Sequence, residues 1–319
     1  QVQFVLSLFI SGIAAGAGIM AAQYWGKQDA ASIEKVIPIA LRTNLLFSGL
    51  FTILAGFCPE MLMRIFTNDA ALVASGSQYL RAVALSYVLC GISQVYLILL
   101  KNTGHAAVSS RISSTAVVLN IILNAILIYG LCGAPALGIR GAAYATVAAR
   151  VVELIWAYLE TKKPERVRIL WNRLFSSAGK ILSEDFWRYT LPVLAASLVW
   201  GIAYVLYSVI MGHMGSDAVA ANSITSIAKS LLSCLIRGVS GGAGVLIGNL
   251  LGADELEKAR EYGGRLTHLA IAIGVVTGGL LMLISPAIVH FAPLTDTAAE
   301  YLQYMLLFCG LNLMAQSVN

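Results

Sequence analysis

The chain has 319 residues, of which 58% are hydrophobic and 12% are charged, and its formal net charge is +5. A soluble domain carries about 25% charged residues, so this composition excludes a soluble globular protein. The apolar runs recur at lengths that suit a bilayer, which needs about 20 residues per helix, and they indicate a multi-pass membrane protein.

Nine apolar runs predict the membrane spans. Each run is continuously apolar rather than alternating, and lipid offers no partner to open backbone groups, so the predicted fold class is all-α. The chain opens at Gln1 inside one apolar run and ends in another, and we expect a piece of a longer protein. In chain order, the predicted spans lie near residues 2–25, 37–57, 79–100, 112–133, 139–160, 190–212, 218–251, 266–292 and 299–318.

The basic residues predict the orientation of these spans. Four connections and their flanks hold 15 of the 21 Lys and Arg residues, whereas the opposite connections hold only Arg64 and Arg140. Basic residues concentrate on the cytoplasmic side of membrane proteins, so we place these four connections there. The lipid bilayer then accounts for the net positive charge, and we expect no nucleic-acid partner.

The longest connection, Thr161–Trp187, is basic with interleaved apolar residues. This pattern predicts an amphipathic segment on the anionic inner leaflet, and a partner-binding site is the alternative. The connection also divides the chain into three predicted parts. These are an N-terminal bundle (1–160), a cytoplasmic amphipathic linker (161–189) and an incomplete C-terminal bundle (190–319).

An internal repeat predicts the architecture. The stretch "AGAGIMAAQYWGKQDAASIEKV" (15–36) returns 226 residues later as "GGAGVLIGNLLGADELEKAREY" (241–262), and "FCPEMLMRIFTND" (57–69) returns as "ISPAIVHFAPLTD" (284–296). Six spans separate the two copies of the first stretch, so both copies cross the membrane in the same direction. Such parallel repeats predict two pseudo-symmetric six-helix bundles that rock around a central cavity, which favours a transporter.

The glycines of this repeat also recur. Gly12 and Gly16 in the first copy correspond to Gly238 and Gly242 in the second. Small residues four apart on a membrane helix allow a close approach by another helix, and we expect close packing at these positions.

The sequence resembles the multidrug and toxic compound extrusion (MATE) transporters of the MOP flippase superfamily. The stretches 119–153, "LNIILNAILIYGLCGAPALGIRGAAYATVAARVVE", and 191–224, "LPVLAASLVWGIAYVLYSVIMGHMGSDAVAANSI", carry the resemblance together with the glycine runs. The resemblance places the nine spans at helices two to ten of twelve. It implies an antiporter in the cytoplasmic membrane that exchanges Na+ or H+ for small organic, cationic compounds. We expect a monomer with no cofactor besides the coupling ion, and the chain contains no ATP-binding P-loop pattern.

Two groups of residues are candidates for ion coupling. Arg150 and Glu153 lie three residues apart inside a predicted span, on one helical face, as either a proton-sensitive group or a structural ion pair. The resemblance implies a cation site at Asn120, Asn124 and Thr146, where the family has Asp in place of Asn124. Amides and a hydroxyl can bind Na+ but cannot take up a proton at physiological pH. Interhelical hydrogen bonding is the alternative role of these three residues.

Other features narrow the function. The family often has a carboxylate five residues after a proline of helix seven, and here that position is Ser197, five residues after Pro192. A lipid-linked saccharide flippase and a non-transporting homologue are the alternative functions. The sequence predicts neither an enzyme nor a metal site, because it shows no convergent catalytic constellation and its four histidines are scattered.

Overall fold

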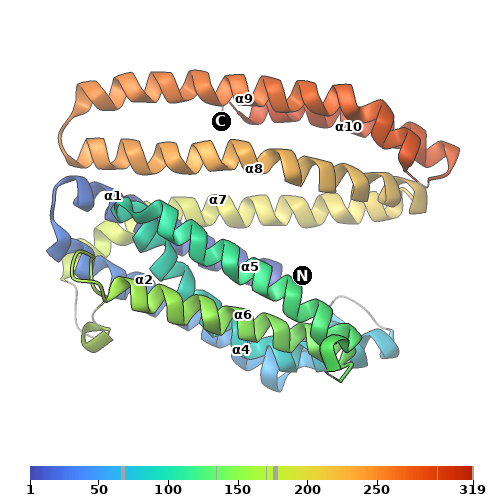
Figure 1. Cartoon of the computed structure of the whole chain (residues 1–319), viewed down its shortest axis with the longest axis horizontal. Helices are drawn as coiled ribbons and strands as arrows, with labels where there is room; N and C mark the ends of the chain where they lie inside the picture. Colours follow the sequence, from blue (N-terminus) through green and yellow to red (C-terminus); the bar gives the residue numbers. More distant parts are fainter. Residues whose placement is uncertain (66–68, 134, 170, 175–178, 293, 318–319) are drawn as a thin grey trace. The chain divides into compact units, whose positions relative to one another are not determined.

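A computed structural model describes the chain except for residues 66–68, 134, 170, 175–178, 293 and 318–319. The described residues form helices and contain no strand (Figure 1), which confirms the predicted all-α fold. The helices are α1 (Val2–Gly26), α2 (Ala30–Phe57), α3 (Pro59–Arg64), α4 (Ala70–Leu100), α5 (Ala106–Tyr129), α6 (Gly138–Thr161), α7 (Lys180–His213), α8 (Ser216–Gly252), α9 (Leu256–Phe291) and α10 (Asp296–Gln316), with short turns at Lys101–His105, Leu131–Gly133 and Trp171–Arg173.

Each of the nine predicted spans coincides with a helix. In the described part of the chain, seven stretches are long and apolar enough to cross a membrane, and one of them, Ala70–Tyr129, contains both α4 and α5. Gly104, with φ of 79°, interrupts this stretch and separates the two helices, because glycine adopts positive φ without a steric penalty. Helix α10 lies at the ninth predicted span but is not among these apolar stretches. The chain is therefore a multi-pass membrane protein.

The chain divides into two compact units, Gln1–Val199 and Trp200–Asn319. Helix α7 contributes to both units, since it starts at Lys180, ten residues before the start that we predicted for its span. The core of the second unit consists of apolar residues of α8, α9 and α10, among them Leu281, Leu302 and Leu306.

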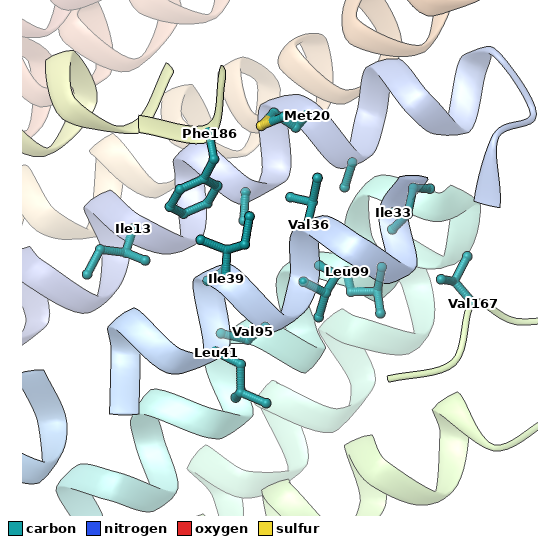
Figure 2. Close-up of a cluster of buried hydrophobic side chains, with 14 of the residues drawn as sticks. Ile13, Met20, Ile33, Val36, Ile39, Leu41, Val95, Leu99, Val167 and Phe186 are labelled. Carbon is teal, nitrogen blue, oxygen red and sulfur yellow. The ribbon is translucent and has the colours of Figure 1, made fainter. Parts of the chain in front are cut away.

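The largest buried cluster of the first unit joins α1, α2 and α4 (Figure 2). Val167 and Leu174 of the predicted linker belong to this cluster, with 6% and 8% of their surface exposed. Trp171 lies between them and donates a hydrogen bond from Nε1 to the Tyr96 hydroxyl at 2.8 Å. These apolar residues of the linker therefore pack on the helical bundle, while the proposed contact of the linker with the inner leaflet stays a prediction.

The turn after α1 has the same backbone conformation as the turn after α8. Gln28 and Asp254, 226 residues apart, have φ of 57° and 62°, and positive φ is uncommon for residues other than glycine. Helices α2 and α9 begin at the same offset, as do α4 and α10. The sequence repeat is therefore also a structural repeat. Three backbone hydrogen bonds recur in the two turns. In the first turn the N–H groups donate to carbonyls as Lys27 to Gln23, Gln28 to Trp25 and Asp29 to Tyr24. In the second turn the equivalent bonds are Ala253 to Asn249, Asp254 to Leu251 and Glu255 to Leu250.

Candidate functional site

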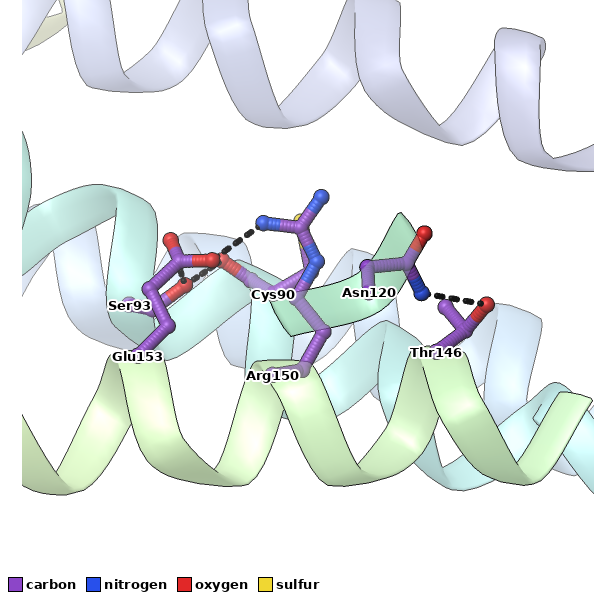
Figure 3. A network of polar contacts seen from close by, with 6 residues as sticks. All are labelled: Cys90, Ser93, Asn120, Thr146, Arg150 and Glu153. Atoms are coloured by element: carbon purple, nitrogen blue, oxygen red, sulfur yellow. Dashed lines mark hydrogen bonds and ion pairs between the residues drawn. The ribbon is translucent and has the colours of Figure 1, made fainter. Parts of the chain in front are cut away.

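A buried ion pair lies on α6, where the sequence predicts it (Figure 3). The Arg150 Nη1 donates to the Glu153 Oε2 at 2.5 Å. Glu153 is 2% exposed, and its second oxygen, Oε1, accepts a hydrogen bond from the Ser93 hydroxyl of α4 at 3.1 Å. Residues three apart on a helix face the same side, which explains why the two charges meet.

Burial determines the energetics of this pair. A buried charge without a partner is strongly destabilising, whereas a pair whose remaining oxygen accepts a hydrogen bond is tolerated. Glu153 meets both conditions through Arg150 and Ser93. The pair therefore fixes α6 against α4, in addition to any role in transport.

A second polar group joins α5 and α6. The Asn124 Nδ2 donates to the Asn120 Oδ1 at 3.1 Å, and the Asn120 Nδ2 donates to the Thr146 hydroxyl at 3.4 Å. The structure therefore brings together all three residues of the predicted cation site.

One oxygen of this group stands out. The Asn124 Oδ1 is buried and has no hydrogen-bond partner among the described residues. A buried polar atom without a partner costs free energy, so such an atom calls for a ligand or another explanation. Neutral oxygens of amides and hydroxyls can ligate Na+, and this group has the chemistry of a cation site.

A cavity of about 200 Å³ opens beside the ion pair. Its walls come from α1, α4 and α6, and Arg150 contributes to them. The other lining residues are Gln3, Leu6, Ser7, Ile10, Ser11, Ser86, Tyr87, Cys90 and Gln94. The cavity is thus a mixed polar and apolar space in contact with the partly buried guanidinium of Arg150.

The Ser197 hydroxyl is hydrogen-bonded within its own helix. It donates to the Val193 carbonyl of this helix, α7, at 2.9 Å. In the described part of the chain it has no hydrogen bond to either polar group. The position where the family often has a carboxylate therefore carries a neutral side chain whose hydroxyl is bonded to the backbone.

Sequence reasoning missed Ser93 and Cys90, which both belong to α4 and contact or line the site. A signal existed, because polar residues inside an apolar membrane run are uncommon and often functional. Their partners lie on α6, about 60 residues further along the chain, so the sequence offered no local pairing.

Ionisable and polar groups that converge inside membrane helices mark functional sites, and transporters are one class of membrane protein that holds such a site near the middle of the bilayer. Residues 1–126 and 192–319 match the family model MatE. The chain belongs to the MatE family.

Individual relatives agree with this assignment. The "Uncharacterized transporter YisQ" of Bacillus subtilis is 21% identical over 89% of this chain and 62% of its own length. The "Probable multidrug resistance protein NorM" of Thermotoga maritima is 26% identical over 89% of this chain and 61% of its own. The chain thus spans less than two thirds of the length of these curated relatives.

A solved structure has the same fold. The crystal structure of MATE in complex with MaD5 superposes with a TM-score of 0.84 at 22% identity, over 99% of this chain and 70% of that one. This agreement confirms the predicted bundle architecture of the MATE fold.

Proposed function

We propose that the protein exports small organic compounds across the cytoplasmic membrane in exchange for Na+ or H+, by alternating access between two bundles. Family membership and a relative named as a multidrug resistance protein support export. The buried Asn124 Oδ1 without a described partner supports cation coupling, and it is the observation on which the coupling proposal rests.

We place the coupling ion at Asn120, Asn124 and Thr146. Their oxygens are neutral, so a bound Na+ needs no prior loss of a proton. Glu153 is a less suitable proton carrier, since its protonation leaves the Arg150 guanidinium without its counter-charge in a partly buried position. The arrangement therefore favours Na+ over H+.

Ion-driven export by the full-length protein in proteoliposomes tests this proposal. We would load rhodamine 123 or fluorescein and impose a Na+ gradient or a pH gradient. We expect export under the Na+ gradient, and we expect Asn124→Ala to reduce its initial rate by about ten-fold, because a lost ligand costs roughly 1.4 kcal/mol or more.

Asn312→Ala is the matched control. Asn312 is an exposed residue of α10, and the same substitution there should leave the rate unchanged. A response to the pH gradient alone would move the coupling site to Glu153. Export of neither dye under either gradient would contradict the antiporter proposal and favour a non-transporting homologue.

A further inference from the structure

We propose that the cavity beside Arg150 binds the anionic group of an organic substrate, such as a carboxylate or a sulfonate. This inference rests on the proposed export function and specifies its substrate class. It replaces the cationic substrate that the family resemblance implies. The charge, the hydrogen-bond donors and the size of the cavity all suit such a group.

The charge of the cavity wall is positive. Among the described residues that line the cavity, Arg150 is the only charged one. Its counter-ion Glu153 does not line the cavity, is 2% exposed and has its second oxygen bonded to Ser93. A ligand therefore meets the cation first and the carboxylate only behind it. Opposite charges attract more strongly at the low dielectric of a membrane protein than in water, and like charges repel more strongly.

The donors of the cavity suit an acceptor group. A guanidinium has five N–H donors in a planar fork that matches both oxygens of a carboxylate. In the described part of the chain, Glu153 occupies only the Nη1 nitrogen of Arg150. The Arg150 side chain is 30% exposed, so the rest of the fork can reach a ligand. Figure 3 shows the guanidinium extending from α6, with Cys90 beside it.

The rest of the wall can hold the body of such a ligand. Ser7, Ser11 and Gln94 supply polar groups, whereas Leu6 and Ile10 supply an apolar surface. The volume of about 200 Å³ is smaller than the roughly 300–1,000 Å³ typical of drug-sized sites. The cavity therefore encloses the charged end of the substrate while the remainder extends beyond it.

Equilibrium binding of two dyes to the purified chain tests this substrate class without requiring transport. Fluorescein is anionic at pH 8, and rhodamine 123 is a cation with the same xanthene scaffold. Fluorescence anisotropy should give a Kd for fluorescein at least ten-fold below that for rhodamine 123. Equal affinities, tighter binding of rhodamine 123, or no binding of fluorescein would overturn the proposal. Ion-driven export remains a separate measurement, so each of the two proposals can fail alone.

The decisive variant removes both charges of the pair, Arg150→Gln with Glu153→Gln, so that no unpaired charge stays buried. We expect it to weaken fluorescein binding by roughly ten- to a hundred-fold, the range for a lost charged hydrogen bond. Arg140→Gln is the control, because Arg140 is exposed on the same helix, and it should change the Kd by less than two-fold. An unchanged Kd in the double variant would overturn the proposal.

Labelling of Cys90 provides a readout that keeps both charges of the ion pair in place. Cys90 lines the cavity and is free. In a chain whose other four cysteines are replaced by serine, bound fluorescein should slow the alkylation of Cys90 by N-ethylmaleimide several-fold, and rhodamine 123 at the same concentration should not. Protection by rhodamine 123 alone would overturn the assignment.

Discussion

The two copies of the repeat begin with the same turn but differ in how their glycines pack. An added Cβ at Gly16 of α1 would lie 2.7 Å from the Thr190 Cα of α7, and at Gly12 it would lie 3.0 Å from the Leu194 Cα. At Gly238 and Gly242 it would meet no atom within 4 Å among the described residues. The expected close packing is therefore confirmed in the first copy and is not seen among the described residues of the second.

A second difference is an exchange of side chains. In the first copy Ser48 of α2 faces Gly91 of α4, whereas in the second Gly274 of α9 faces Ser317, the residue that follows α10. Ser48 and Gly274 are equivalent positions, as are Gly91 and Ser317. Each helix pair thus has one serine and one glycine at this crossing, on opposite partners. The two copies therefore share the same combined side-chain volume at this contact. Close-packed helices tolerate a swap of residues between partners better than a change in the total volume.

The largest expected effect on stability comes from removing one charge of the Arg150–Glu153 pair in the first unit. Glu153→Ala leaves the Arg150 guanidinium partly buried without a counter-ion, and breaking such a pair costs about 3–5 kcal/mol. Glu300→Ala, at an exposed position of α10, should change stability by less than about 0.5 kcal/mol. Denaturant unfolding in detergent measures both. Equal losses would show that the pair contributes nothing particular to the first unit.

The next effect concerns the glycines. We expect Gly16→Ala to destabilise the protein by about 1–3 kcal/mol, because the backbone of Thr190 must move to admit the methyl group. Gly242→Ala should be neutral or stabilising by up to about 1 kcal/mol, because alanine favours the helix and meets no neighbour. Paired melting curves of the two variants decide the matter, and a larger loss at Gly242 would reverse the comparison.

The serine–glycine crossing predicts a smaller, coupled effect. Gly91→Ser alone adds an atom 2.6 Å from the Ser48 hydroxyl oxygen and should cost about 1–2 kcal/mol. Combining it with Ser48→Gly recreates the arrangement of the second copy and should recover most of that loss. A double-mutant cycle should show coupling of about 1 kcal/mol. Strict additivity would mean that the two positions do not interact.

The smallest effect distinguishes the two turns. Asp29 caps α2 by accepting hydrogen bonds from the side chain and backbone N–H of Ser32, whereas the equivalent Glu255 has no side-chain cap bond in the described structure. Asp29→Ala should therefore cost about 0.5–1 kcal/mol and Glu255→Ala still less. Thermal unfolding of the two variants measures the difference.

This cap also predicts a pH dependence. The hydrogen bond from the Ser32 hydroxyl, followed by that from its backbone N–H, lowers the pKa of the Asp29 carboxyl. The stabilisation is therefore fully present above the usual Asp pKa of about 3.9 and is lost as the pH falls through the lowered value. The contribution is small because Asp29 is partly exposed to solvent. The gap between wild type and Asp29→Ala should narrow below about pH 4, and a gap that widens would exclude the cap as its cause.

Local patterns in the sequence predicted more than contacts between distant segments. The nine predicted spans, the repeat and the Arg150–Glu153 pair all follow from apolar runs or from a spacing of three residues. Helix α7 begins ten residues before its predicted span, because the charges at Lys180, Glu184 and Asp185 exclude these residues from hydrocarbon but not from a helix. The cavity and the Ser93 contact depend on how α1, α4 and α6 pack together, and no single segment encodes that arrangement.

The ion pair of α6 also has a consequence for biosynthesis. Helix α6 is the least apolar of the seven candidate stretches, with a mean hydropathy of 1.3. A lone Arg or Asp near the centre of a helix adds about 2.5–3.5 kcal/mol to the free energy of insertion by the translocon. Because Arg150 and Glu153 lie on one face of the same helix, the counter-charge of Arg150 is already present on α6 when this helix is synthesised and inserted. It can therefore enter the bilayer as a nearly neutral segment, before Ser93 of α4 is in place to complete the network.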